Sequence, residues 1–172
     1  ADVHEDDLFE LWNKAKIQHL ATPNIGLITD IICCPGGDFC SLANAKSIPI
    51  SDSIQQVFDD MDYLHDIGDI DLNISGCMNA CGHHHVGHIG ILGVDKDGSE
   101  WYQVTLGGNQ GNFANIGKVI GPSFSADEIP IVIRKIVDTF VEERHPDETF
   151  IDCVIRIGLE PFKQVVYGKK AN

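Results

Sequence analysis

The chain has few basic residues. Its 172 residues include 12 lysines and arginines against 26 aspartates and glutamates, which gives a formal net charge of −14. Nucleic acids and anionic membranes attract proteins through positive surface charge, so we expect neither as a partner. Only three arginines occur, all late in the chain: Arg134, Arg144 and Arg156. This composition is also unfavourable for an active site that must collect anions.

Long apolar runs are missing as well. No run approaches the ~20 residues that a helix needs to span a bilayer. The N-terminus, ADVHEDDLFE, is acidic and lacks the basic and apolar regions of a secretory signal. Hydrophobic residues make up 43% of the chain, which predicts one globular domain over residues 1–172. We expect this domain to be cytoplasmic.

Hydrophobic periodicity and turn residues predict a chain that mixes helices and strands. The expected helices are 5–20, 41–47, 52–65, one from Asp127 or Glu128 to about 141 with Pro130 in its first turn, and 149–158. The expected strands are 27–34, 69–75, and a hairpin of 88–95 and 100–106 that turns at Asp97–Gly98. These elements indicate an α+β fold with helices packed on a mixed sheet of about five strands.

Four of the six cysteines form two pairs, Cys34-x5-Cys40 and Cys77-x3-Cys81, and each pair follows an expected strand. In a reducing compartment such clusters favour a metal over disulfides. Structural zinc sites generally have tighter spacings in both pairs. The wide, glycine-rich first loop leaves many backbone N–H groups free for the sulfurs of a [4Fe–4S] cluster. We therefore expect the four sulfurs to lie together at one edge of the sheet.

The other two cysteines, Cys33 and Cys153, are interpreted as ordinary buried residues, because a free cysteine behaves as a small hydrophobic side chain. Cys33 is a rival to Cys34 as a ligand. Adjacent strand residues point to opposite faces, so only one of the two can face the cluster. We expect Cys33 to point into the core.

Four histidines follow the second cysteine pair: His83, His84, His85 and His88. His84 and His88 have the i, i+4 spacing of one helix face, which suggests a zinc site. Histidines of this kind more often line a loop or lie at the surface. The role of these four residues stays open from the sequence.

The motifs CCPGGDFCSLANAKSIP, SGCMNACGHHHVGHIGILG and VTLGGNQG resemble the C-terminal cofactor half of the sirohaem-containing sulfite and nitrite reductases. That family has C-x5-C, then G-C-x-N-x-C-G, then a strand that ends in L-G-G-N. The matching positions are Cys34, Cys40, Cys77, Asn79, Cys81, Gly82 and the run from Leu106 to Asn109. The resemblance covers residues 28–111, and residues 125–160 fit the family's closing helices.

The resemblance implies that Cys34, Cys40, Cys77 and Cys81 bind a [4Fe–4S] cluster, and that Cys81 also bridges to the iron of sirohaem. It implies a six-electron reduction of sulfite to sulfide or of nitrite to ammonia. Asn79 and the turn Gly107–Gly108–Asn109 would approach the cluster or the macrocycle. The implied element order is β-α-β-α-β-β-β, followed by two or three helices.

The chain departs from the family in two ways. The family holds the anion and the sirohaem carboxylates with several arginines and lysines, whereas only Lys46 lies near the cysteine motifs here. The family's enzymes are also much longer. Because those enzymes carry the basic anion pocket mostly in their other half, we expect this chain to be a C-terminal fragment, and its start without Met fits that. Its expected partners are the N-terminal half and an electron donor, either a flavoprotein subunit or ferredoxin.

Two other functions use the same cysteines: a non-catalytic iron–sulfur module for electron transfer, and a zinc-stabilised interaction domain. The sequence does not distinguish sulfite from nitrite as the substrate.

Overall fold

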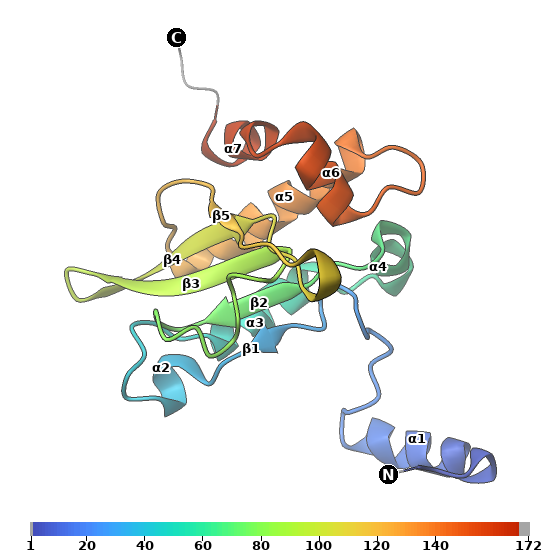
Figure 1. The fold of residues 1–172 in the computed structure, drawn as a ribbon. Helices are drawn as coiled ribbons and strands as arrows, with labels where there is room; N and C mark the ends of the chain where they lie inside the picture. Colours follow the sequence, from blue (N-terminus) through green and yellow to red (C-terminus); the bar gives the residue numbers. More distant parts are fainter. Residues whose placement is uncertain (1, 169–172) are drawn as a thin grey trace.

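Five strands form one mixed sheet in the computed structural model, which describes residues 2–168 (Figure 1). The strands lie in the order of the sequence: β1 (Ile32–Cys33), β2 (Leu72–Ser75), β3 (Ile89–Lys96), β4 (Ser99–Leu106) and β5 (Lys118–Val119). The first three strands are parallel, and β4 and β5 are antiparallel to their neighbours. The α+β architecture with about five strands is therefore confirmed.

Seven α-helices and three short 3-10 helices occur among the described residues. The α-helices are α1 (Leu8–Ile17), α2 (Gly36–Phe39), α3 (Ile48–Val57), α4 (Met61–Ile67), α5 (Ile129–Glu143), α6 (Phe150–Ile157) and α7 (Glu160–Tyr167). The 3-10 helices are Glu5–Asp7, Gly111–Phe113 and Ala126–Glu128. In Figure 1, α3 and α5 lie behind the sheet, and α6 and α7 lie beyond α5.

The core lies between the sheet and these helices. Leu72, Ile74, Ile89, Ile91, Val104 and Leu106 pair across β2, β3 and β4 on one face of the sheet, and each is at most 1% exposed. The apolar stripe of α5 packs into the same cluster. Full burial of one such side chain contributes roughly 1.5–3 kcal/mol, so this layer fixes the sheet on which the cysteine loops stand.

The opposite face of the sheet carries loops. Asn73, Gly90 and Thr105 pair across β2, β3 and β4 on that face. The segment between β2 and β3 folds back over them, since a side chain at Gly90 would collide with the carbonyl group of His84. This segment therefore covers the face of the sheet opposite the helical layer.

The helix expected over 52–65 is wrong as a single element. The structure has α3 and α4 instead, separated at residues 58–60. Asp60 has extended backbone angles and its carboxylate accepts the N–H groups of Asp62 and Tyr63. This N-cap starts a new helix with a new direction.

Two other expected elements differ. Residues 41–47 form turns, and the short helix α2 lies earlier, between Cys34 and Cys40. The strand expected over 27–34 contains only Ile32 and Cys33, because residues 25–30 are mostly turns that bring Leu27 and Ile28 into the core.

The hairpin and the closing helices agree with the prediction. Asp97 and Gly98 both have positive φ, as the two-residue turn between β3 and β4 requires. Ser125 and Glu128 form a capping box ahead of α5, and Pro130 lies in the first turn of α5, as expected. Three helices close the chain, with α7 lying beyond the expected range of 125–160.

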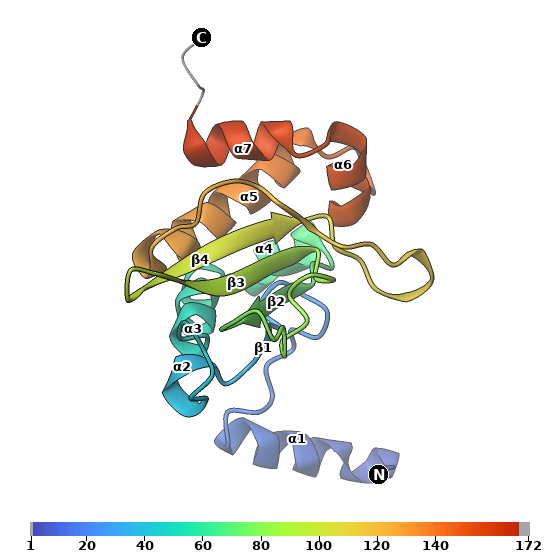
Figure 2. The same ribbon diagram turned by 60° about the vertical axis from the view of Figure 1, so that its left-hand side comes forward.

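The N-terminal helix α1 stands apart from the rest of the chain (Figures 1 and 2). It is shorter than the expected helix over 5–20, and none of its residues is buried. Its apolar side chains Leu8, Phe9, Leu11 and Trp12 are 46–73% exposed. Among the described residues, no helix has both the length and the apolar character that crossing a membrane requires.

Candidate metal centre

The two cysteine loops meet at the carboxyl ends of β1 and β2. Because these strands are parallel, Cys34 and Cys77 leave the sheet at the same edge. The carbonyl oxygen of Gly76 accepts hydrogen bonds from the amides of Asn44 and Ala45, at 2.8 and 3.0 Å. The loop that carries Cys34 and Cys40 is therefore bonded directly to the start of the loop that carries Cys77 and Cys81.

The sulfur of Cys34 faces this junction. It accepts a hydrogen bond from the amide of Gly76 at 3.1 Å and lies 3.5 Å from the hydroxyl of Ser47. Burial opposes charge on this sulfur, but the hydrogen bonds from Ser47, Gly76 and Gly36 outweigh it and lower the pKa of Cys34. A thiolate, which is the form that binds iron, is favoured here.

Cys33 has the opposite environment. It packs against the hydrophobic core, as expected. Burial, followed by the neighbouring Cys34 and Asp52, raises the pKa of Cys33 to about 11. Cys153 is fully buried in α6, as predicted. Of the adjacent pair, Cys34 is thus the better metal ligand.

Cys40 ends α2 and is half-buried. Its loop is braced from β4: the carboxylate of Glu100 accepts the amide of Lys46 at 3.2 Å and the hydroxyl of Tyr102 at 3.1 Å. The Tyr102 hydroxyl also donates to the carbonyl of Lys46 at 3.0 Å. The Lys46 ammonium in turn pairs with Asp38, at 3.0 Å. These contacts hold both ends of the segment from Asp38 to Lys46.

The second loop presents its central residues to solvent. Met78, Asn79 and Cys81 are exposed, whereas Cys77 is 8% exposed. A turn closed by the Ala80 amide on the Cys77 carbonyl sets this arrangement. Cys81 is therefore open to a group that approaches from outside the domain, and Cys77 is not.

The segment from Gly82 to His88, here the histidine loop, contains no helix, so the i, i+4 helix geometry expected for His84 and His88 is wrong. Four hydrogen bonds join this loop to neighbouring segments. The Gly82 amide donates to the Ser75 hydroxyl, and the Asn73 side-chain amide donates to the His83 carbonyl. The backbone amides of Gly117 and Gly107 donate to the carbonyls of His85 and His88. His84 is 8% exposed, and its Nδ1 has no partner among the described residues. Burial, and then His85, lower the pKa of His84.

The Leu106–Asn109 motif packs against the histidine loop. Gly107 has φ of +83°, and a side chain at Gly108 would lie 2.9 Å from the carbonyl oxygen of His85. Asn109 forms an isolated bridge with Asn115 and donates its side-chain amide to Phe113. Gly107 and Gly108 are buried, and both contact the histidine loop.

No three His, Cys, Asp or Glu side chains within residues 2–168 are arranged to hold a single metal ion. A [4Fe–4S] cluster takes one thiolate at each of four irons, so its ligands are spread more widely than those of one ion. The donor set fits such a cluster chemically, because the backbone amides of Gly76 and Gly36 already donate to the Cys34 sulfur.

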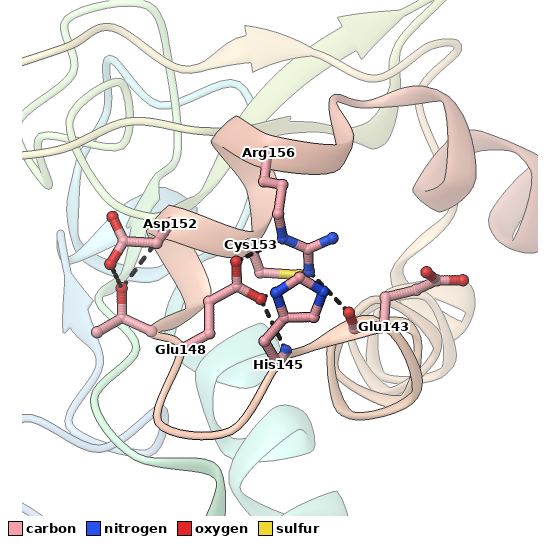
Figure 3. A network of polar contacts seen from close by, with 7 residues as sticks. Glu143, His145, Glu148, Asp152, Cys153 and Arg156 are labelled. Carbon is pink, nitrogen blue, oxygen red and sulfur yellow. Dashed lines mark hydrogen bonds and ion pairs between the residues drawn. The ribbon is translucent and has the colours of Figure 1, made fainter.

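Arginine side chains lie away from this centre. Arg134 pairs with Asp138, Arg144 with Asp66, and Arg156 with Glu148 at 2.6 Å. Figure 3 shows the last pair in a network around Cys153, where Arg156 also donates to the carbonyl of Glu143. A cavity of about 580 Å³ beside it is lined by residues 66–69, Val141 and residues 144–149, and its lining includes no cysteine.

Residues 27–172 match the family described as the nitrite and sulphite reductase 4Fe-4S domain. The chain belongs to that family.

Relatives of this family domain include both kinds of reductase. The chain is 27% identical to an assimilatory-type sulfite reductase of Nitratidesulfovibrio vulgaris, over 78% of this chain and 59% of the relative. It is 29% identical to the hemoprotein beta-component of the NADPH sulfite reductase of Yersinia pestis, over 86% of this chain and 26% of the relative. An assimilatory ferredoxin-dependent nitrite reductase of Haloferax mediterranei is 28% identical over 69% of this chain and 21% of the relative.

The fold agrees with the NirA protein of Mycobacterium tuberculosis, with a TM-score of 0.79 and 25% identity over 94% of this chain and 31% of NirA. A dissimilatory sulfite reductase I shares the fold, with a TM-score of 0.66 and 15% identity. The chain thus spans less than two thirds of the length of these proteins.

Sequence reasoning missed three features of the centre: the Ser47 hydroxyl beside Cys34, the Gly76 amide on the same sulfur, and the brace from Glu100 and Tyr102. Local spacing carries no signal for them, because Cys34 and Gly76 are 42 residues apart and Lys46 and Glu100 are 54 apart. The expected hairpin placed β4 but not its contact with Lys46.

Proposed function

We propose that this chain is the [4Fe–4S]/sirohaem-binding domain of a sulfite or nitrite reductase, with Cys34, Cys40, Cys77 and Cys81 as cluster ligands. The observation that carries the proposal is the junction of the two cysteine loops, where the Gly76 amide donates to the Cys34 sulfur. When bound, the cluster and sirohaem would supply electrons for the six-electron reduction of the anion.

Each part of the site has a role under this proposal. Cys34 is held as a favourable thiolate, and Cys40 is kept in place by the brace on its loop. Cys77 is shielded, while the exposed Cys81 supplies the thiolate that is shared with the sirohaem iron. Asn79 lies on the same exposed turn as Cys81. Gly107, Gly108 and Asn109 act by supporting the histidine loop beside the macrocycle.

The anion-binding half of the reductase is the proposed partner of this domain. Sirohaem carries many carboxylates, and burying them without paired cations is costly. The arginines of this chain are already paired with carboxylates, so the other half would supply the cations. We place the reductase in the cytoplasm, where thiols stay reduced, and propose ferredoxin or a flavoprotein subunit as its electron donor.

The test uses the full-length reductase purified without oxygen. We expect about five irons and four sulfides per chain, with four of the irons in the cluster and one in sirohaem, together with visible bands of sirohaem and turnover of sulfite or nitrite with a chemical electron donor. Cys81→Ser is expected to abolish turnover, because cluster assembly and the bridge to sirohaem both need that thiolate. Near wild-type turnover in Cys81→Ser would rule out the proposed mechanism.

The isolated chain is the second arm of the test. Reconstituted with iron, sulfide and sirohaem, it is expected to fold but not to reduce either anion, because its charge of −14 repels both anion and macrocycle. Turnover comparable to that of the full-length protein would show that the other half is dispensable.

A further inference from the structure

Ser47 occupies the N-cap position of α3, yet its hydroxyl does not cap the helix. A serine at this position ordinarily accepts an N–H group of the first helical turn, which stabilises the helix by about 1 kcal/mol. Here the side chain is fully buried and lies 3.5 Å from the sulfur of Cys34. The hydroxyl is therefore directed to the cysteine rather than to the helix.

The surroundings of Ser47 are built to admit it. A Cβ atom at Gly36 would lie 2.6 Å from the Ser47 hydroxyl oxygen, and one at Gly76 would lie 2.9 Å from the same atom. Gly36 belongs to the first cysteine loop and Gly76 begins the second. The Ser47 side chain thus lies between the two cysteine loops, at the point where both approach Cys34.

We propose that Ser47 donates a hydrogen bond to the Cys34 thiolate and thereby sets the reduction potential of the cluster. The inference rests on the proposed function, since it needs a cluster bound through Cys34. A thiolate has no proton to give, so the hydroxyl must be the donor. Reduction adds negative charge to a cluster, and donors to its sulfurs stabilise the reduced form. Ser47 therefore raises the potential.

Ser47 and Gly76 act as a pair on this sulfur. The Gly76 amide provides one donor at 3.1 Å and the hydroxyl a second. The amide belongs to the backbone, so Ser47 is the member of the pair that a side-chain substitution can remove.

The experiment compares Ser47→Ala with Ser51→Ala in the full-length reductase. Ser51 is also buried and lies one turn further along α3, so it controls for loss of a buried hydroxyl. The midpoint potential of the cluster is measured by spectroscopic redox titration, with iron and sulfide content measured in parallel. We expect a lower potential in Ser47→Ala at unchanged iron content, and the wild-type potential in Ser51→Ala.

An unchanged potential in a fully loaded Ser47→Ala, or an equal shift in Ser51→Ala, would overturn the inference. If Ser47→Ala does not retain iron, the midpoint potential is measured in Ser47→Thr instead, because threonine keeps the hydroxyl. A potential close to that of the wild type is then expected, and a lowered one would overturn the inference. Absence of iron from the anaerobic wild-type protein would instead contradict the proposed function, so the two failures are distinguishable.

Discussion

The amide of Gly76 lies 3.1 Å from the sulfur of Cys34 and donates a hydrogen bond to it. This contact joins a residue at the end of β2 to a cysteine at the end of β1. It requires a residue without a side chain at position 76, since a Cβ there would lie 2.6 Å from the carbonyl oxygen of Ala45. The geometry of the metal centre therefore depends on that glycine.

Gly76→Ala is expected to destabilise the fold by about 1–3 kcal/mol, the usual range for overpacking a tight site. Gly37→Ala is the matched control, because a Cβ at that position of the other cysteine loop would meet atoms only at 3.4 Å or beyond. The unfolding free energy of both variants is measured with urea. Equal stability of the two variants would contradict the close approach at Gly76.

Cys33 and Cys34 are adjacent but are expected to differ in function. Cys34→Ala should lose most of the bound iron, because its thiolate receives the hydrogen bonds at the loop junction. Cys33→Ala should retain iron, because Cys33 packs against the core and burial raises its pKa to about 11. Iron and acid-labile sulfide are measured after anaerobic purification. Loss of iron in Cys33→Ala would reverse the assignment.

The apolar side of α1 is expected to contact the other half of the reductase. Phe9 and Trp12 are 73% and 46% exposed, and the match to NirA covers 94% of this chain, a larger share than the residues 27–172 of the family domain. Amides of residues 8–17 should exchange hydrogen rapidly in the isolated chain and slowly in the full-length reductase.

Phe9→Ala combined with Trp12→Ala should remove that protection without lowering helix propensity, since alanine is the best helix former. The control, Glu10→Gln with Lys14→Gln, changes the ion pair of the same helix and should leave protection intact. Rapid exchange in the full-length wild type would contradict a contact there. Protection that grows with the concentration of the isolated chain would indicate a second copy instead.

The Arg156–Glu148 pair makes stability depend on pH. Hydrogen bonds from Arg156, and then from the His145 amide, hold the pKa of Glu148 at about 2, below its ordinary value of 4.5. The ionised form is favoured by folding, so this contribution is present above pH 4.5 and is lost as the pH falls towards 2. Glu148→Gln should show a weaker loss of stability with acid over that window.

Urea unfolding at several pH values from 6 to 3 measures this effect. Glu142→Gln, which changes an exposed carboxylate of α5, should keep the pH dependence of the wild type. The same slope in Glu148→Gln and in the wild type would show that the pair is not linked to folding.

The sequence by itself determined the family, the fold class and the elements with strong local signals. The spacings within the two cysteine pairs and the Asp97–Gly98 turn each depend on residues that are close in the chain. Such patterns report hydrogen bonds and backbone angles within a few residues, and those survive in the folded protein.

The tertiary structure decided the rest. The apolar stripe across 52–65 is compatible with one helix, but α3 ends at Val57 and Asp60 caps a second helix, α4. No pattern in the sequence signals the position of the Ser47 hydroxyl, which lies 3.5 Å from the Cys34 sulfur and against Gly36 and Gly76. Contacts of this kind depend on which distant segments meet, which local periodicity does not encode.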